Sequence, residues 1–249
     1  MTRTTLCILL ACILGSSHRA GAAERQPQDH ASSHGKPSAF RRLANDSATP
    51  LLTRQTLAIV STGAALAALA TTFEDPGAMA RFLDRSPWDK PADVGNVYGN
   101  GLLLSSGATA LWAGGAWAHD ANLRDAGFDA MRSLGITFGA VAALKLAVRR
   151  TRPDGGAYSF PSGHTAGAFA VAPVLARHFG ARIAVPAYVL AVMTGMGRLE
   201  DRKHFLSDVL FGATIGTAAG LASASAGSTP ASPVTLSLRP DRATVSVRF

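Results

Sequence analysis

The sequence predicts an all-α protein, a six-helix up-down bundle that ends in a short C-terminal β-hairpin. Three observations lead to this fold class. The chain has 249 residues, of which 47% are hydrophobic and 16% charged, and this is enough for one domain with a sizeable core. Six long stretches after residue 53 are predicted to be helical. The last residues instead alternate apolar and polar side chains, as strands do.

The N-terminal part of the chain is predicted to direct export. Residues 1–22 resemble a secretory signal peptide, with Arg3 as the basic region, an apolar stretch over 6–14, and small residues at 20–22 as the cleavage site. Residues 23–52 are polar and rich in Ser, His and Pro, which indicates a flexible linker. Both cysteines lie within the predicted signal peptide, so the mature chain would have no disulfide and no thiol nucleophile.

The helical-bundle domain is expected to span residues 53–226. A long loop containing Pro76, Pro87, Pro91 and Asn96 is predicted between the first two helices. The six predicted helices cover residues 54–72, 101–118, 131–148, 162–178, 183–196 and 207–222.

The tail, residues 227–249, is expected to form the β-hairpin. Its apolar and polar side chains alternate on both sides of Pro240 and Asp241, where the turn is predicted. One hairpin is too little to form a membrane barrel, so the terminal Phe249 is not taken as a barrel signal.

Three short blocks of polar residues carry groups that bind and transfer phosphate. The first is Lys145, then six residues, then Arg152 and Pro153. The second is the run 161–164, Pro-Ser-Gly-His. The third is Arg198, then five residues, then His204, then three residues, then Asp208. These blocks fall at the ends of predicted helices, so all three should meet at one end of an up-down bundle.

Phosphoryl transfer requires positive charge around the phosphate oxygens, because charge spreads over them in the transition state. Arg152 and Arg198 can each present a planar pair of donors to a phosphate, and Lys145 adds a compact charge. Ser162 can donate its hydroxyl. The amide of Gly163 can approach a phosphate closely because no Cβ blocks it. The predicted helix start after Pro161 offers free N–H groups to an anion.

The two histidines supply the predicted covalent and acid-base chemistry. Asp208 lies four residues after His204, so the two side chains share one face of a helical turn. The carboxylate can hold one ring nitrogen of His204 as N–H and leave the other free to attack phosphorus. His164 is then the general acid that protonates the leaving oxygen, and it later activates the water that releases phosphate.

Other polar residues near the blocks are given structural roles. His119 and His178 have no motif around them and are interpreted as loop or helix-end residues. Arg149 and Arg150 crowd the first block, and one of them could touch the substrate. The charged run 200–203 is interpreted as a solvated, internally paired loop that could contact the leaving group.

The three blocks together resemble the type 2 phosphatidic acid phosphatase superfamily, which also contains the vanadium haloperoxidases and bacterial acid phosphatases. The resemblance covers roughly residues 55–222. Gly197, which replaces the usual Ser, is the one departure at a motif position. The resemblance implies the bundle fold of these enzymes and assigns the same roles to the same residues: His204, His164 and Asp208 as catalytic, and Lys145, Arg152, Ser162, Gly163 and Arg198 as phosphate-binding.

The resemblance predicts a metal-independent phosphatase without a cofactor, which hydrolyses phosphate mono- or pyrophosphate esters through a phosphohistidine. Lipid-linked esters are the expected substrates. The alternatives are a broad-specificity periplasmic acid phosphatase on soluble esters, a vanadate-dependent haloperoxidase, and a non-catalytic scaffold. The sequence leaves the individual substrate and the oligomeric state open.

The formal charge of +8 and the isoelectric point of about 10.3 suit anionic substrates or an anionic membrane surface. No basic stripe with interleaved aromatic residues is present, so no nucleic-acid partner is expected. The protein is predicted to be exported, and to be either periplasmic or in the inner membrane with its site facing the periplasm. Whether the helices span the bilayer stays open, because they are rich in Ala, Gly, Ser and Thr.

Overall fold

The computed structural model describes residues 53–75, 77, 78, 81, 89–226, 234–239 and 242–247. The predicted signal peptide, the whole predicted linker and the predicted turn at 240–241 lie outside these residues. Seven helices are present in the part of the chain that is described. They are α3 (Arg54–Ala70), α5 (Asp89–Tyr98), α6 (Gly101–Trp117), α7 (Ala121–Val148), α8 (Gly163–Phe179), α9 (Ala181–Glu200) and α10 (Leu206–Ala226).

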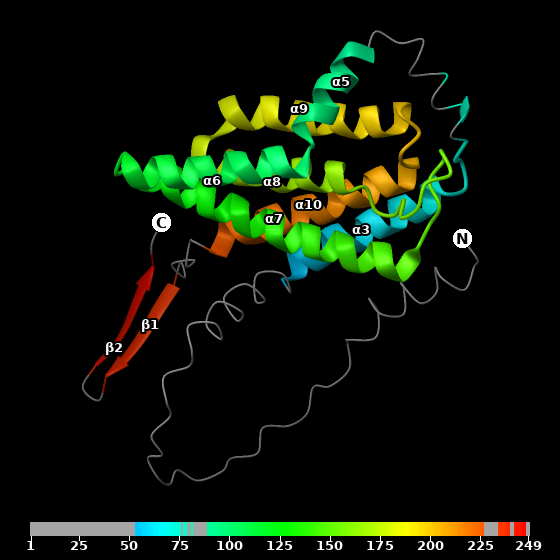
Figure 1. Ribbon diagram of the computed structural model, residues 1–249. Helices are drawn as coiled ribbons and strands as arrows, with labels where there is room; N and C mark the ends of the chain where they lie inside the picture. The colour runs from blue at the N-terminus through cyan, green and yellow to red at the C-terminus, as the bar shows by residue number, and fades with distance from the viewer. Residues whose placement is uncertain are drawn as a thin grey trace, which may run out of the picture.

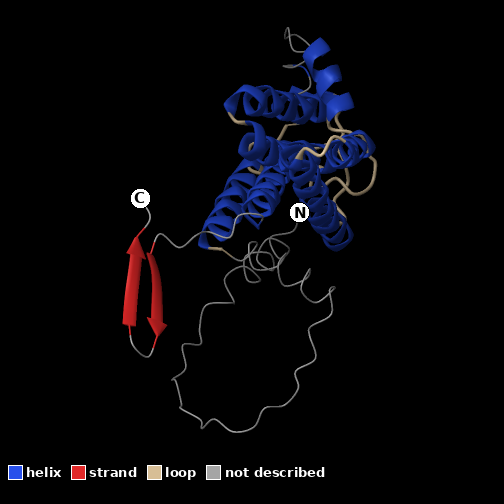
Figure 2. Ribbon diagram, turned by 90° about the vertical axis from the view of Figure 1, so that its left-hand side faces the viewer, coloured by secondary structure: helices blue, strands red, loops and turns tan. Residues whose placement is uncertain are grey.

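The helices form one bundle with α8 at its centre, in contact with α7, α9 and α10 (Figures 1 and 2). Helix α3 packs against α10, and α6 packs against α7. Helices α3, α7 and α9 end at the same end of the bundle at which α6, α8 and α10 begin. We call this end, which holds residues 74, 149–164 and 196–208, the motif end.

The predicted count of six helices was wrong, because residues 89–98 form α5 where the sequence indicated a loop. Pro91 is compatible with this helix because it lies in the first turn, where backbone N–H groups have no partner within the helix. Gly95 allows α5 to approach α9, since a Cβ at this position would lie 2.3 Å from the backbone of Met193.

Helix α7 begins ten residues earlier than predicted. Its first turns carry the charged residues Arg124, Asp125, Asp129 and Arg132, which hide the apolar periodicity on which the prediction depended. The helix starts at Asp120, whose carboxylate accepts a hydrogen bond from the backbone N–H of Leu123. Such N-caps stabilise a helix by about 1 kcal/mol.

Beyond the bundle, β1 (Val234–Arg239) and β2 (Arg242–Val247) form an antiparallel pair. Val234 lies opposite Val247, and Arg239 lies opposite Arg242. The strands fall within the tail, while the residues of the predicted turn are not among those described.

Close contact between α8 and α10 depends on three glycines of α10. Gly212, Gly216 and Gly220 recur every four residues and therefore share one face of the helix. A Cβ on them would lie 2.6 Å from the carbonyl oxygen of Ser162, 2.1 Å from that of Ala166 and 2.5 Å from that of Ala170, respectively. The backbones of the two helices are therefore as near to each other as glycine permits.

We predict that Gly216→Ala destabilises the protein by about 1–3 kcal/mol, because the added methyl group forces α10 away from α8. Gly139→Ala on α7 is the matched control, since a Cβ there meets nothing within 4 Å. It should be neutral or stabilising by up to about 1 kcal/mol, as alanine favours helix. Thermal unfolding of both variants checks this. Equal midpoints for the two would show that the α8–α10 contact tolerates a side chain.

Candidate active site

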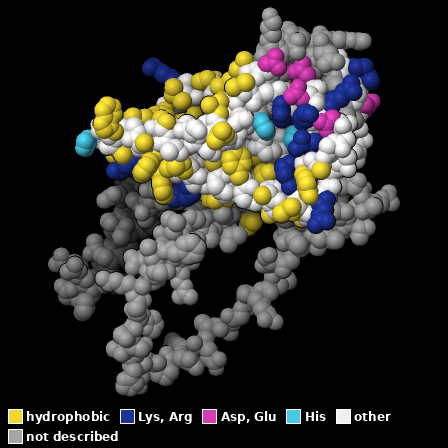
Figure 3. All heavy atoms as spheres, viewed as in Figure 1, with side chains coloured by type: hydrophobic (Ala, Val, Ile, Leu, Met, Phe, Trp, Pro, Cys, Tyr) yellow, Lys and Arg dark blue, Asp and Glu magenta, His cyan; other side chains and the backbone are white. Residues whose placement is uncertain are grey.

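All three sequence blocks lie at the motif end of the bundle. Lys145 is in the last turn of α7, Arg198 is in the last turn of α9, and Gly163 is the first residue of α8. Charged side chains gather at this end, whereas apolar side chains cover much of the bundle's length in the same view (Figure 3). The prediction that helix ends would bring the blocks together agrees with this placement.

The backbone joins the second block to the third. The N–H of Ser162 donates a hydrogen bond to the carbonyl oxygen of Asp208, over 3.0 Å. The N–H of His204 donates to the carbonyl oxygen of Arg198, over 3.2 Å, so the loop between α9 and α10 folds back on the end of α9. Together, these two bonds hold the loop that carries His204 close to the start of α8.

Asp208 is fully buried and its carboxylate is held from several sides. Oδ2 accepts a hydrogen bond from the backbone N–H of Phe205, over 2.9 Å, and another from the hydroxyl of Ser159. Nδ1 of His204 lies 3.5 Å from Oδ2, within ion-pair distance but without the geometry of a hydrogen bond. The carboxylate faces the ring nitrogen that it was predicted to hold.

The cationic residues lie around the two histidines. The ammonium group of Lys145 donates to the carbonyl oxygen of Tyr158, over 2.5 Å. Nε of Arg152 is buried and has no hydrogen-bond partner among the described residues, so this donor is free for an anion. Nε of Arg198 donates to the side-chain oxygen of Asn96, over 2.8 Å, and Nη2 donates to the carboxylate of Asp201.

Ser162 and Gly163 form the N-terminus of α8. Ser162 is the N-cap and is fully buried, with its hydroxyl 2.9 Å from the hydroxyl of Thr165. Either hydroxyl can be the donor of this bond, and when Thr165 donates, the proton of Ser162 is free for a phosphate. A Cβ on Gly163 would meet only Val141, at 3.5 Å, so packing within the protein does not require glycine at this position.

Burial and positive charge act on both histidines. Burial, together with the charges of Arg198, Arg152 and Lys145 and the proximity of His204, lowers the pKa of His164 to about 4. Burial also lowers the pKa of His204, against the opposing effect of Asp208. The site without an anion therefore favours neutral imidazoles at neutral pH.

Sequence reasoning missed several residues of this site. Arg150 lies within the first block, but its guanidinium contacts Asp208 and Glu74 and does not join the cations around the two histidines. Asn96 comes from α5, the helix that was not predicted, and it contacts Arg198 and Asp201. The adjacency of Arg150 to Arg152 was a usable signal, whereas no local pattern marked Asn96 or Glu74.

The charged run 200–203 forms pairs beyond itself. Asp201 contacts Arg198, and Lys203 pairs with Asp154 over 2.8 Å. The interpretation of this run as internally paired was therefore wrong for these two residues, because the loop 149–162 and the end of α9 supply nearer partners.

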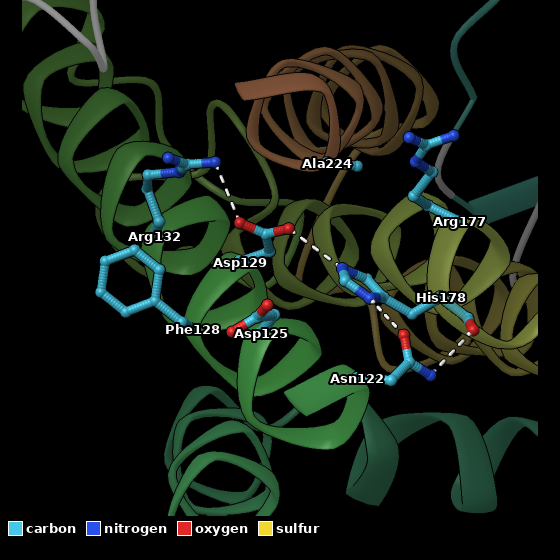
Figure 4. Close-up of a pocket in the computed structure, with 8 residues that line it drawn as sticks. All are labelled: Asn122, Asp125, Phe128, Asp129, Arg132, Arg177, His178 and Ala224. Atoms are coloured by element: carbon cyan, nitrogen blue, oxygen red, sulfur yellow. Dashed lines mark hydrogen bonds and ion pairs between the residues drawn. The ribbon is translucent and has the colours of Figure 1, made fainter. Parts of the chain in front are cut away.

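A second polar cluster lies at the opposite end of the bundle, around a cavity of about 480 Å³ (Figure 4). His178 lies between Asp129 and the side-chain oxygen of Asn122, at 3.0 Å from each, and Asp129 also pairs with Arg132. Asp129 and Lys145 are separated by about 24 Å along α7. The cluster joins α7 to α8, in agreement with the structural role predicted for His178. His119 lies between α6 and α7, as predicted.

Among the described residues, no group of three or more His, Cys, Asp and Glu side chains is placed to hold a metal ion. The polar atoms that lack partners here, Nε of Arg152 and Nδ1 of His204, belong to the predicted phosphate site. The arrangement can therefore receive an anion between a set of cations and a histidine.

Comparison with known proteins connects this geometry to a family. Residues 127–229 match the sequence model of the PAP2 superfamily, and this range contains all three blocks. A lipid A 1-phosphatase of Porphyromonas gingivalis is 44% identical over 86 residues, which are 33% of this chain and 19% of that protein. The chain thus spans about a fifth of the length of this curated relative.

Two solved structures are similar at 23% identity. The crystal structure of Aquifex aeolicus LpxE gives a TM-score of 0.45, covering 58% of this chain and 91% of that one. The PAP2 type phosphatidylglycerolphosphate phosphatase from Bacillus subtilis gives a TM-score of 0.48, covering 75% of this chain and 92% of that one.

The family match falls on the part of the chain that carries Lys145, Arg152, residues 161–164, Arg198, His204 and Asp208. Over residues 127–229, this chain is therefore similar in sequence to the PAP2 superfamily.

Proposed function

We propose that this protein is a phosphatase that hydrolyses lipid-linked phosphate esters through a phosphohistidine, without a metal ion. The observation that carries the proposal is the meeting of three separate sequence blocks at one end of the bundle. There, His204 faces the buried carboxylate of Asp208, and three cations surround the two histidines. The lipid A 1-phosphatase relative supports a phosphorylated lipid as the substrate class.

In the first step, Nε2 of His204 attacks phosphorus and a P–N bond forms as the ester P–O bond breaks. Asp208 keeps the proton of His204 on Nδ1, which leaves the Nε2 lone pair free. His164 gives its proton to the leaving oxygen, so the lipid departs as a neutral alcohol or a less charged phosphate.

In the second step, water attacks the phosphorus of the phosphohistidine. His164, now neutral, takes the proton from this water, and the P–N bond breaks to return His204 and release phosphate. Lys145, Arg152 and Arg198 stabilise the charge on the equatorial oxygens in both steps, together with the amide of Gly163. Arg198 has to exchange its contact with Asp201 for the phosphate.

The exterior of the bundle supports a lipid substrate. Large apolar side chains on several helices are exposed, which favours contact with a bilayer, since such patches are rare on soluble monomers. Examples on different helices are Leu66 of α3, Leu102 and Trp117 of α6, Leu146 of α7 and Val185 of α9.

Two described helices, α7 and α10, are long and apolar enough to cross a membrane. In the 18-residue apolar stretch of α7 that could cross a membrane, only 22% is buried within the protein. We therefore infer that the bundle is inserted in the inner membrane, and that the motif end lies at a surface of the bilayer. If residues 1–22 are a cleaved signal peptide and α3 crosses the bilayer, the motif end lies at the cytoplasmic surface, because residue 23 then starts outside the cytoplasm. A periplasmic motif end requires that α3 does not cross the bilayer or that residues 1–22 do not act as a signal peptide.

The direct test is hydrolysis by the purified protein in mixed micelles. We expect phosphate release from lipid A carrying a 1-phosphate, or from phosphatidylglycerol phosphate, in the presence of EDTA. His204→Ala should lower kcat by several orders of magnitude, because it removes the nucleophile. Circular dichroism checks that this variant is folded. The proposal fails if the wild-type protein releases no phosphate, or if His204→Ala retains its activity. Hydrolysis of soluble esters alone would indicate a broad-specificity acid phosphatase instead.

The role of His164 predicts a dependence on the leaving group. His164→Ala should reduce kcat by about 10²–10⁴-fold on a lipid phosphate, whose alkoxide leaving group requires a proton. The loss should be smaller on an aryl phosphate such as p-nitrophenyl phosphate, whose leaving group is stable as an anion. Equal losses on both substrates would show that His164 is not the general acid.

The lowered pKa values predict an acid-shifted pH profile for kcat/KM. His204 must be neutral and His164 protonated, so activity rises as His204 loses its proton and falls as His164 loses its own. Both limbs should lie below pH 6.5, the ordinary pKa of histidine. Each limb reports the titration of the two interacting histidines together.

A bound phosphate cancels part of the positive potential and raises the pKa of His164. We therefore expect the falling limb to lie at higher pH in kcat than in kcat/KM. Identical positions in the two profiles would contradict this electrostatic account.

A further inference from the structure

Arg150 is placed differently from the cations of the phosphate site. Its Nη1 donates to Oδ1 of Asp208, over 2.8 Å, and to the hydroxyl of Ser207, over 2.7 Å. Its Nη2 donates to Oε2 of Glu74, also over 2.7 Å. The guanidinium lies over the ring of Phe205, 3.8 Å from the ring centroid. Nη1 thus directs both of its N–H groups to protein oxygens, and Nη2 directs one of its two to Glu74.

Glu74 completes this network from a distant part of the chain. Its second oxygen, Oε1, accepts a hydrogen bond from the backbone N–H of Ser207, over 2.7 Å. The side chains of Glu74 and Arg150 are only 7% and 14% exposed. A buried carboxylate bound at both oxygens has one orientation, so Glu74 fixes the plane of the Arg150 guanidinium.

The charges of this network alternate outward from the candidate nucleophile. The imidazole of His204 is followed by the carboxylate of Asp208, the guanidinium of Arg150 and the carboxylate of Glu74. Arg150 alone would weaken the attraction of Asp208 for a proton on His204. Glu74 offsets that charge, so the three groups together carry one negative charge toward the ring.

We propose that Arg150 and Glu74 are positioning residues for Asp208: Arg150 fixes its carboxylate against His204, and Glu74 fixes Arg150 and balances its charge. This inference rests on the proposed function, because it assumes that His204 is the nucleophile. Through Asp208, the two residues keep the proton of His204 on Nδ1 and direct Nε2 toward the phosphate.

The test compares Arg150→Gln, Glu74→Gln and the double variant in the full-length protein, with a lipid phosphate as substrate. Two neighbouring substitutions are matched controls. Arg149→Gln removes an exposed charge whose Nε contacts only the carbonyl oxygen of Leu146, and Asp75→Asn removes an exposed carboxylate that accepts from Ala78. Both controls should retain wild-type kinetics.

Arg150→Gln should lower kcat by about 10²-fold, since a misplaced catalytic group costs about that factor. KM and the inhibition constant of inorganic phosphate should not change, because Arg150 does not touch the phosphate. If both constants rise together while kcat is kept, Arg150 is a phosphate ligand and the inference is wrong.

The pH profile separates positioning from simple loss of structure. His204 also faces Lys145, Arg152 and His164, and these stay the same in every variant. Removal of the positive charge in Arg150→Gln raises the pKa of His204, so the rising limb of kcat/KM moves to higher pH. Removal of the negative charge in Glu74→Gln lowers that pKa, so the same limb moves to lower pH.

The double variant removes both charges, so its rising limb should return toward the wild-type position while kcat stays low. It also serves if a single variant does not fold, because it leaves neither member of the Arg150–Glu74 pair charged without the other. A folded double variant with wild-type kcat would overturn the inference. So would limbs that shift in the same direction in the two single variants. Wild-type protein without phosphatase activity would instead refute the proposed function.

Discussion

The close approach of α8 to α10 is the contact on which the rest of the site depends. Gly212, Gly216 and Gly220 leave no room for a side chain between the two backbones. The contact continues into the hydrogen bond from the N–H of Ser162 to the carbonyl oxygen of Asp208. Since α8 carries His164 and α10 carries Asp208, the spacing between these two residues follows from helix packing, before any side chain is considered.

The charges at the motif end divide into paired and unpaired groups. Asp208 pairs with Arg150, Asp201 with Arg198, and Asp154 with Lys203. In the part of the chain that the structure describes, Lys145 and Arg152 form no such ion pair. The site is therefore positively charged where a phosphate is proposed to lie, and burial together with that charge lowers the pKa of His164. In the proposed mechanism, binding of an anionic substrate and protonation of His164 are therefore coupled.

Helix α5 shows how a part of the fold outside the family match contributes to the site. It packs on α9 through Gly95 and places Asn96 against Arg198. Glu74 likewise precedes residues 127–229, yet it fixes Arg150 inside them. The residues of the proposed phosphate site lie within the matched range, whereas Asn96 and Glu74, which contact Arg198 and Arg150, come from the N-terminal half of the chain.

The sequence by itself determined the three blocks, because their chemistry depends on short spacings that a helix or turn converts directly into geometry. The four-residue step from His204 to Asp208 is one such spacing, and the N-cap at Ser162 is another. The sequence also indicated most helices of the bundle, since they are long and apolar. Only the tertiary structure placed Glu74 against Arg150, 76 residues away, and Asn96 against Arg198, 102 residues away. Local periodicity reports on neighbours along the chain, whereas these contacts depend on which helix ends meet in space.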